Sequence, residues 1–155
     1  MSVAKLIDKE LVYLNEHIET KEELYGFVAD HLFQIGFVKK TYKEALIARE
    51  REYPTGLSLE GVNIGIPHTD CFHIEEPFIY LVKTKHSVTL THMGTDDVEI
   101  PVHYLFFLGI KKPTEQVQLL QTLMDKFQDP EFVHLLKHIE ENERLVSFLK
   151  KEFKE

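Results

Sequence analysis

The segment Gly61-Val62-Asn63-Ile64-Gly65-Ile66-Pro67-His68-Thr69-Asp70 places a histidine directly after a short apolar stretch and a proline. Proline forces the residue before it into an extended conformation, so the imidazole of His68 leaves the stretch in a defined direction. A neutral imidazole has a free nitrogen lone pair at pH 7, because its unperturbed pKa is about 6.5. His68 could therefore accept an acyl or phosphoryl group and pass it on. The residues by themselves also fit a turn that carries a surface histidine.

Two arginines, Arg49 and Arg51, lie at the end of a short predicted helix. A guanidinium offers a planar fork of donors that matches the geometry of a phosphate group. The alternative is a solvated arginine that pairs with Glu50 or Glu52, a surface contact that contributes little to stability.

A metal site is the third possibility, because His68, Asp70, Cys71, His73 and Glu75 lie close together in the sequence. Imidazole and thiolate suggest zinc, but the spacing His-x-x-Cys-x-His has no distant second pair of ligands. We therefore predict no metal and no cofactor, with a zinc-dependent hydrolase or metal-binding module as the alternative from another class. Cys71 is predicted to be a half-buried small apolar residue rather than a protease nucleophile.

The other histidines form no second site of this kind. His103 lies inside an apolar stretch, which predicts a hydrogen-bonded core histidine, and His134 and His138 are one helical turn apart on a predicted exposed face. The sequence has no glycine-rich phosphate-binding loop, which argues against an ATP-dependent kinase.

Helical signals occupy the first third of the chain. Thr20 followed by Glu23 fits a capping box that opens a helix ending at Gly36, and Thr41 followed by Glu44 fits a second box. The second helix should end near Arg51. We expect residues 4–17 to form a weak helix or an extended arm.

Strand signals follow in the middle of the chain, and helices return at its end. Strands are predicted over 62–66, 78–82, 88–91 and 102–110, the last as the sheet centre. Helices are predicted from Pro113, Pro130 and Asn142, the first with an apolar stripe of Val117, Leu120, Leu123, Met124 and Phe127. Central strands this apolar imply an α/β fold with the sheet sandwiched between helices.

Composition excludes several classes of function. The 155 residues include 18 basic and 26 acidic ones, for a net charge of −8, which argues against nucleic-acid binding and a polybasic membrane patch. No window approaches the ~20 apolar residues of a membrane span, so we expect no membrane insertion. One cysteine and no export signal predict a cytoplasmic protein, and the length predicts one domain over 1–155.

The two segments Ala45-Leu46-Ile47-Ala48-Arg49-Glu50…Tyr53-Pro54-Thr55-Gly56 and Ile64-Gly65-Ile66-Pro67-His68 resemble the EIIA component of the bacterial sugar phosphotransferase system (PTS). The resemblance is to the type 2 superfamily of fructose, mannitol and nitrogen-regulatory proteins, in its galactitol-like branch. It runs from about residue 20 to 150.

This resemblance implies a mixed sheet and a phosphotransferase activity through a phosphohistidine. His68 matches the residue that takes a phosphoryl group from the phosphocarrier HPr and gives it to a cysteine of EIIB. EIIB then phosphorylates a sugar or hexitol that enters through the membrane component EIIC. Arg49 matches the arginine that stabilises the phosphoryl group. A regulatory EIIA paralogue, which switches a partner by its phosphorylation state, is the alternative within the superfamily.

The chain departs from the mannitol and nitrogen-regulatory members at one place. Those members carry a second histidine where this chain reads Pro113-Thr114-Glu115-Gln116. Gln116 could donate a hydrogen bond to a phosphoryl oxygen but carries no charge, and the Thr69 hydroxyl is another candidate donor. The difference favours the galactitol-like branch.

Overall fold

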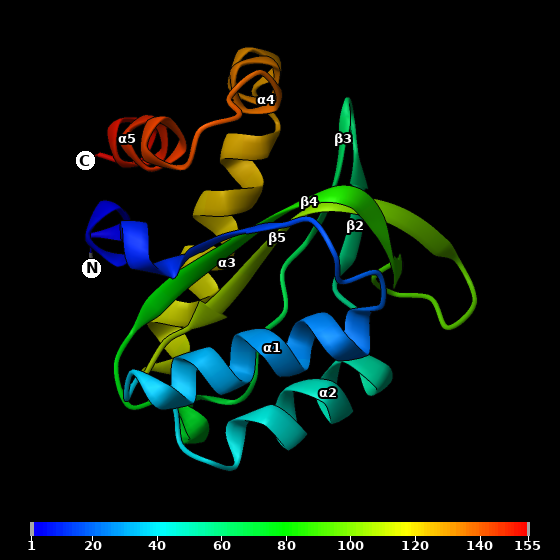
Figure 1. Ribbon diagram of the computed structural model, residues 1–155, viewed down its shortest axis with the longest axis vertical. Coiled ribbons are helices and arrows are strands. Elements are labelled where there is room, and N and C mark those ends of the chain that lie inside the picture. The colour runs from blue at the N-terminus through cyan, green and yellow to red at the C-terminus, as the bar shows by residue number, and fades with distance from the viewer. Residues whose placement is uncertain (1, 155) are drawn as a thin grey trace.

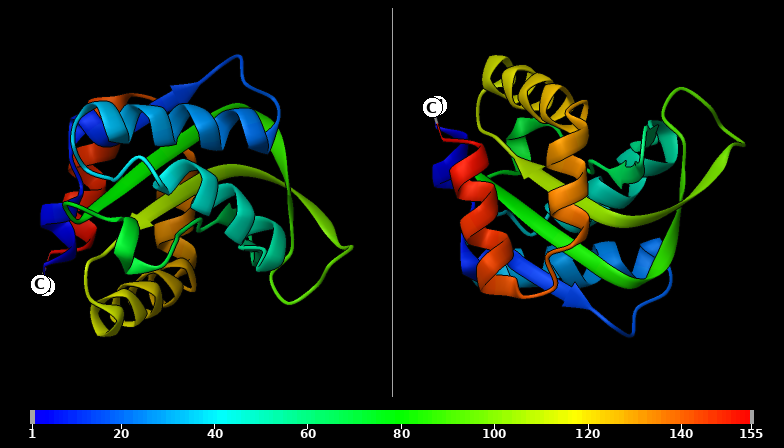
Figure 2. Two further views of the ribbon diagram at one scale, coloured as in Figure 1. Left: turned by 90° about the horizontal axis from the view of Figure 1, so that it is seen from below. Right: turned by 90° about the horizontal axis from the view of Figure 1, so that it is seen from above.

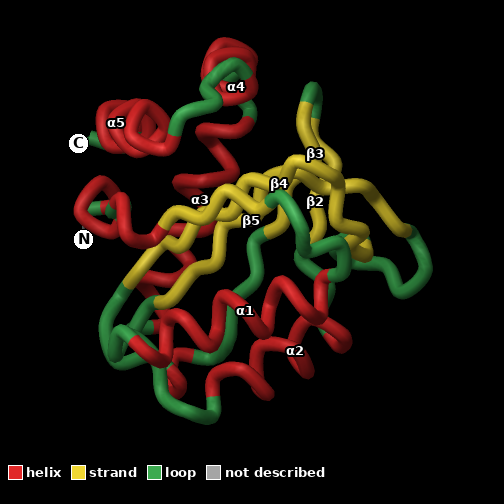
Figure 3. Tube along the Cα trace, in the orientation of Figure 1, coloured by secondary structure: helices red, strands yellow, loops and turns green. Residues whose placement is uncertain are grey.

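The computed structural model describes residues 2–154. A mixed five-stranded sheet forms the central layer of the fold (Figures 1 and 3). The strand order is β1-β4-β5-β3-β2. Strands β1 and β4 pair in parallel, as do β3 and β5, whereas the pairs β2–β3 and β4–β5 are antiparallel. The strands are β1 (Val12–Asn15), β2 (Gly56–Leu59), β3 (Val62–Gly65), β4 (Phe78–Thr91) and β5 (Glu99–Gly109).

Helices cover both faces of the sheet (Figures 1 and 2). Helices α1 (Lys21–Gln34) and α2 (Tyr42–Glu52) pack on one face. Helices α3 (Pro113–Phe127), α4 (Pro130–Lys137) and α5 (Asn142–Glu152) pack on the other. The predicted α/β fold, with a mixed sheet between helices, is thus confirmed. No helix within residues 2–154 is long and apolar enough to cross a membrane.

Strand β5 lies at the centre of the sheet, as predicted, and its side chains alternate between two hydrophobic clusters. Tyr104, Phe106 and Leu108 pack with α3, α4 and α5, whereas Leu105 and Phe107 pack with α1 and α2. A strand that is covered on both faces must be apolar at nearly every position, which explains the continuous apolar stretch in the sequence.

Both predicted helix starts are confirmed, but only the first has the predicted capping bond. Thr20 Oγ1 accepts a hydrogen bond from the amide of Glu23 at 3.3 Å, and Gly36 has the positive φ of +82° that favours glycine after a helix. The Thr41 hydroxyl makes no capping bond, because it lies 2.8 Å from Nδ1 of His73.

The strands differ from the prediction in three places. The predicted strands 78–82 and 88–91 are one strand, β4, with an irregular register between Lys83 and Val88. Strand β2 was missed, because its pairing with β3 is not visible in four residues taken alone. Two short 3-10 turns (Val3–Leu6 and Lys9–Leu11) and β1 occupy the region expected to be a weak helix or extended arm.

Two buried positions were also predicted wrongly. Val117 is exposed, and Leu119 takes its place in the buried stripe of α3. His103 is exposed rather than part of the core, because exposed and buried residues alternate over 99–104 of β5 and position 103 is one of the exposed ones; its Nδ1 lies 3.0 Å from the Thr84 carbonyl oxygen. His134 and His138 are exposed on α4 and just after it, as predicted.

Candidate functional site

His68 follows β3 and is held beside the end of β5. The amide of Leu108 donates to the Pro67 carbonyl at 3.0 Å, which fixes the backbone next to the histidine. Nδ1 of His68 lies 2.7 Å from the Ile66 carbonyl oxygen. A carbonyl only accepts hydrogen bonds, so Nδ1 carries the hydrogen and Nε2 carries the lone pair. The backbone thus selects Nε2 as the nucleophilic atom.

The surroundings of His68 favour the neutral ring. Burial lowers its pKa below the ordinary value, and the positive charge of Arg49 lowers it further. The hydrogen bond to Ile66 and the charge of Asp70 act in the opposite direction but do not reverse the shift. The ring is therefore neutral, and its lone pair available, at pH 7.

An NMR titration of the His68 ring should show a midpoint below the unperturbed value of about 6.5. The folded pKa is lowered, so the neutral form persists to a lower pH than in a free histidine. The Asp70→Asn variant removes a charge that raises the pKa, so its midpoint should be lower still. A midpoint above 6.5 in the wild-type protein would contradict this assignment of the local electrostatics.

Arg49 lies in the last turn of α2 and shares a cavity of about 650 Å³ with His68. Its Nη1 lies 3.3 Å from Oδ1 of Asp70, and its guanidinium lies 4.9 Å from the ring centre of Tyr53. The side chain of Asp70 is 78% exposed, so this ion pair is weak, and Arg49 can readily exchange the Asp70 carboxylate for another anion. The structure therefore brings His68 and Arg49 together, whereas Arg51 is exposed and does not line this cavity.

The two supporting residues that the sequence suggested do not line this cavity. Thr69 is only 2% exposed, and its hydroxyl donates to the Asp70 carbonyl at 2.9 Å. Gln116 lies in the first turn of α3, where its Oε1 accepts a long hydrogen bond of 3.8 Å from the Cys71 thiol. A direct contact of either residue with a phosphoryl group stays a prediction.

The loop between β4 and β5 forms a wall of the cavity that the sequence analysis missed. Residues 93–96 line it, and the amide of Met93 donates to the Gly56 carbonyl at 2.7 Å. Gly94, with a φ of +79°, was a signal for a turn. Its place beside Arg49 depends on the pairing of distant strands, which no local pattern encodes.

Glu50 joins the end of α2 to the chain segment that leads into β2. Its side chain is buried, Oε2 accepts from the Thr55 amide at 2.8 Å, and Oε1 accepts from the Thr55 hydroxyl at 2.6 Å. Burial raises the pKa of Glu50, and the bonds from Thr55 partly offset this shift. The bonds hold in place the loop of residues 53–55, which lines the cavity beside Arg49.

The Glu50→Ala variant should lower the free energy of unfolding by about 2–4 kcal/mol, because it leaves the two buried donors of Thr55 without their acceptors. Urea unfolding followed by circular dichroism measures this difference. Glu52→Ala, two residues away and exposed, is the matched control and should change stability by less than about 0.5 kcal/mol. Equal effects of the two substitutions would contradict the role of Glu50.

The residues considered for zinc have other partners. His73 pairs with Thr41, and Cys71 is half-buried with a pKa raised by burial, which disfavours the thiolate. Across residues 2–154, no three His, Cys, Asp or Glu side chains are grouped closely enough to hold a metal ion.

Comparisons with known proteins agree with this fold. A family model described as "Phosphoenolpyruvate-dependent sugar phosphotransferase system, EIIA 2" matches residues 5–152. The galactitol-specific EIIA component of Escherichia coli K12 is 34% identical over 116 residues, which cover 75% of this chain and 77% of that protein. The chain is therefore a phosphotransferase component. It belongs to the EIIA 2 family of the sugar phosphotransferase system.

Two solved structures from Escherichia coli have the same fold. The structure of IIA mannitol gives a TM-score of 0.72 at 20% identity and covers 92% of this chain and 97% of its own. The complex of enzyme IIAMtl with phosphorylated enzyme IIBMtl gives a TM-score of 0.73 at 19% identity, with 92% and 95% covered. At these identities the likeness concerns the fold alone.

Proposed function

We propose that the whole chain is one EIIA domain that acts as a cytosolic phosphohistidine carrier, with His68 as the residue that is phosphorylated. The observation that carries this proposal is the 2.7 Å contact between Nδ1 of His68 and the Ile66 carbonyl, which leaves the lone pair on Nε2. His68 lines the same cavity as Arg49, so an anionic group on Nε2 would be formed near a guanidinium.

In the first step, Nε2 of His68 attacks the phosphorus of phospho-HPr. The new N–P bond forms as the N–P bond of HPr breaks, and the electron pair of that bond returns to the histidine of HPr. The Nδ1 hydrogen of His68 stays on the ring, where the Ile66 carbonyl stabilises the positive charge that the ring gains. The protonated ring is a good leaving group for the next transfer.

In the second step, a cysteine thiolate of EIIB attacks the same phosphorus, and the electron pair of the Nε2–P bond returns to the ring. Such transfers have a loose transition state, so the protein mainly positions groups and stabilises charge. Arg49 can exchange its exposed ion pair with Asp70 for the phosphoryl oxygens. One guanidinium stabilises the group without holding it so tightly that transfer to EIIB would slow.

Exposed apolar side chains near His68 support docking of partner proteins. Tyr53 lines the cavity and is exposed. Phe72, four residues after His68, is 67% exposed. Val117 is exposed and follows Gln116, which contacts Cys71. Exposed apolar groups of this kind mark interaction surfaces. HPr and EIIB would use this surface in turn, and EIIC would be reached only through EIIB. The complex of IIAMtl with phosphorylated IIBMtl, a related pair, supports EIIB as a partner.

A galactitol-type hexitol is the proposed substrate class of the whole transport system. The support is the 34% identity to a galactitol-specific EIIA component, together with the absence of a histidine from residues 113–116, the region where the resemblance implies one in mannitol and nitrogen-regulatory members. The sugar itself does not bind this chain in the relay.

The experiment is stepwise transfer followed by intact-mass measurement. Incubation with phosphoenolpyruvate, enzyme I and HPr should add the mass of one phosphoryl group, and addition of the galactitol EIIB should remove it. Failure to accept the group would refute the carrier function. Acceptance without transfer to EIIB would favour the regulatory paralogue instead.

A further inference from the structure

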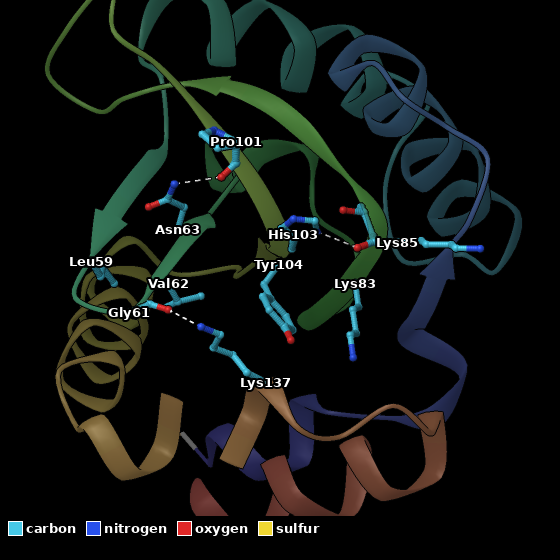
Figure 4. Close-up of a pocket in the computed structure, with 11 residues that line it drawn as sticks. Leu59, Gly61, Val62, Asn63, Lys83, Lys85, Pro101, His103, Tyr104 and Lys137 are labelled. Carbon is cyan, nitrogen blue, oxygen red and sulfur yellow. Dashed lines mark hydrogen bonds between the residues drawn. The ribbon is translucent and has the colours of Figure 1, made fainter. Parts of the chain in front are cut away.

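A second cavity opens between β3, the middle of β4 and β5, and the end of α4 (Figure 4). Its volume is about 640 Å³, within the range of roughly 300–1,000 Å³ that is typical of small-molecule sites. It shares no lining residue with the cavity at His68. The phosphoryl relay proposed above makes no use of it.

This cavity is basic, although the chain has a net charge of −8. Its lining includes Lys83, Lys85 and Lys137 but neither aspartate nor glutamate. In the described part of the chain, no carboxylate lies within ion-pair distance of these three lysines. In Figure 4, Lys83 and Tyr104 extend from the sheet toward α4, and Lys137 extends from α4 toward Gly61, whereas Lys85 points away from them. The cavity therefore offers an uncompensated positive charge to an anion.

Lys83 and Lys137 each donate one hydrogen bond to a backbone carbonyl and still have donors for a ligand. Lys83 Nζ donates to the Ile139 carbonyl at 2.7 Å, and Lys137 Nζ donates to the Gly61 carbonyl at 2.9 Å. An ammonium group has three donors, so each keeps two for a ligand. Burial raises the pKa of Tyr104, so its hydroxyl stays protonated and can also donate. This number of donors suits the oxygens and the double charge of a phosphate group.

The other wall of the cavity offers acceptors rather than donors. The Asn63 side-chain amide donates to the Pro101 carbonyl at 2.9 Å, so its Oδ1 is left to accept. Nδ1 of His103 donates to the Thr84 carbonyl at 3.0 Å, so its Nε2 is left to accept. Acceptors of this kind suit the hydroxyl groups of a ligand. The apolar side chain of Val62 and the ring of Tyr104 can cover a carbon skeleton.

We propose that this cavity binds a small phosphorylated polyhydroxy compound, that is, a phosphorylated sugar or polyol. The phosphate contacts Lys83 and Lys137, and the hydroxyl groups donate to Asn63 and His103. The inference rests on the side chains of this cavity and not on the proposed role of His68. A phosphorylated hexitol is also the class of product that the proposed transport system generates, so the site would let the carrier sense that product.

Calorimetry and NMR titration of the full chain with galactitol 1-phosphate, galactitol and inorganic phosphate test the proposal. Galactitol 1-phosphate should bind and shift the amide signals of Val62, Lys83 and Tyr104. Galactitol and inorganic phosphate should each bind at least about tenfold more weakly, because each lacks one set of contacts. The Lys83→Gln and Lys137→Gln variants should each weaken binding of galactitol 1-phosphate about tenfold or more.

Matched controls separate this site from the relay. Lys150→Gln removes an exposed lysine of α5 and should bind as the wild type does. His68→Ala should also bind normally, so the result does not depend on phosphoryl transfer. The proposal is overturned by the absence of binding at millimolar concentration, by equal affinity for inorganic phosphate, or by loss of binding in His68→Ala.

Discussion

Replacing His68 by alanine should abolish phosphorylation of the chain by phospho-HPr. The variant lacks the only Nε2 in this cavity, and no other side chain that lines it in the described structure offers a comparable neutral nucleophile at pH 7. Intact-mass measurement after incubation with phosphoenolpyruvate, enzyme I and HPr should show no added phosphoryl group. The wild-type protein should be modified once under the same conditions.

Two other histidines serve as controls for this experiment. His73→Ala removes the ring that pairs with Thr41, and His103→Ala removes an exposed ring that lies outside the cavity at His68. Both variants should accept the phosphoryl group as the wild type does. Acid-labile phosphate on the His68→Ala variant would show that the phosphorylated residue has been assigned wrongly.

Replacing Arg49 by alanine should slow both transfer steps by roughly 10–150-fold. A charge-assisted contact with a phosphoryl group stabilises it by about 1.5–3 kcal/mol, and each 1.4 kcal/mol is a factor of ten in rate. No other cationic side chain lines this cavity in the described part of the chain. Rapid-quench measurement of transfer from phospho-HPr and then to EIIB gives both rates.

Variants at the neighbouring arginine and at Arg49 itself test the role of the guanidinium fork. Arg49→Lys keeps the charge but loses the planar fork, so it should recover only part of the rate. Arg51→Ala removes an exposed arginine that lies two residues further along α2 and so points about 200° around the helix from Arg49, and it should have little effect. If Arg49→Ala transfers within a factor of about two of the wild type, Arg49 does not act on the phosphoryl group.

Local patterns predicted the elements that depend on local interactions. The Thr20 cap, the stop at Gly36 and the apolar stretch of β5 are set by neighbouring residues or by burial on both faces, so each leaves a clear trace in the sequence. Thr41 shows the limit of this reasoning. Its spacing to Glu44 fits a capping box, but its hydroxyl forms a hydrogen bond with His73, which is distant in sequence.

The candidate site likewise has residues that the sequence predicts and features that depend on the tertiary structure. His68 and Arg49 were predicted from residue type and spacing, and the structure brings them to one cavity. Thr69 was chosen for its hydroxyl, but its burial and its bond to the Asp70 carbonyl depend on how the loop folds back. The wall formed by residues 93–96 and the tautomer of His68 depend on strand pairing and on one backbone carbonyl. No pattern of side chains could have predicted either.

The pairing of β1 with β4 determines when the fold can be completed during synthesis. Val12 is the parallel partner of Leu81, so β1 has no neighbouring strand until the ribosome has made β4, almost 70 residues later. Contacts between residues so far apart in sequence require the closure of a long loop and form late. Until then the apolar side chains of residues 3–11 remain uncovered, because they pack against β4, β5 and the last helix. Residues 3–11 are thus made before the strands and the helix that cover them, and they are among the last residues of this domain to be shielded from proteases.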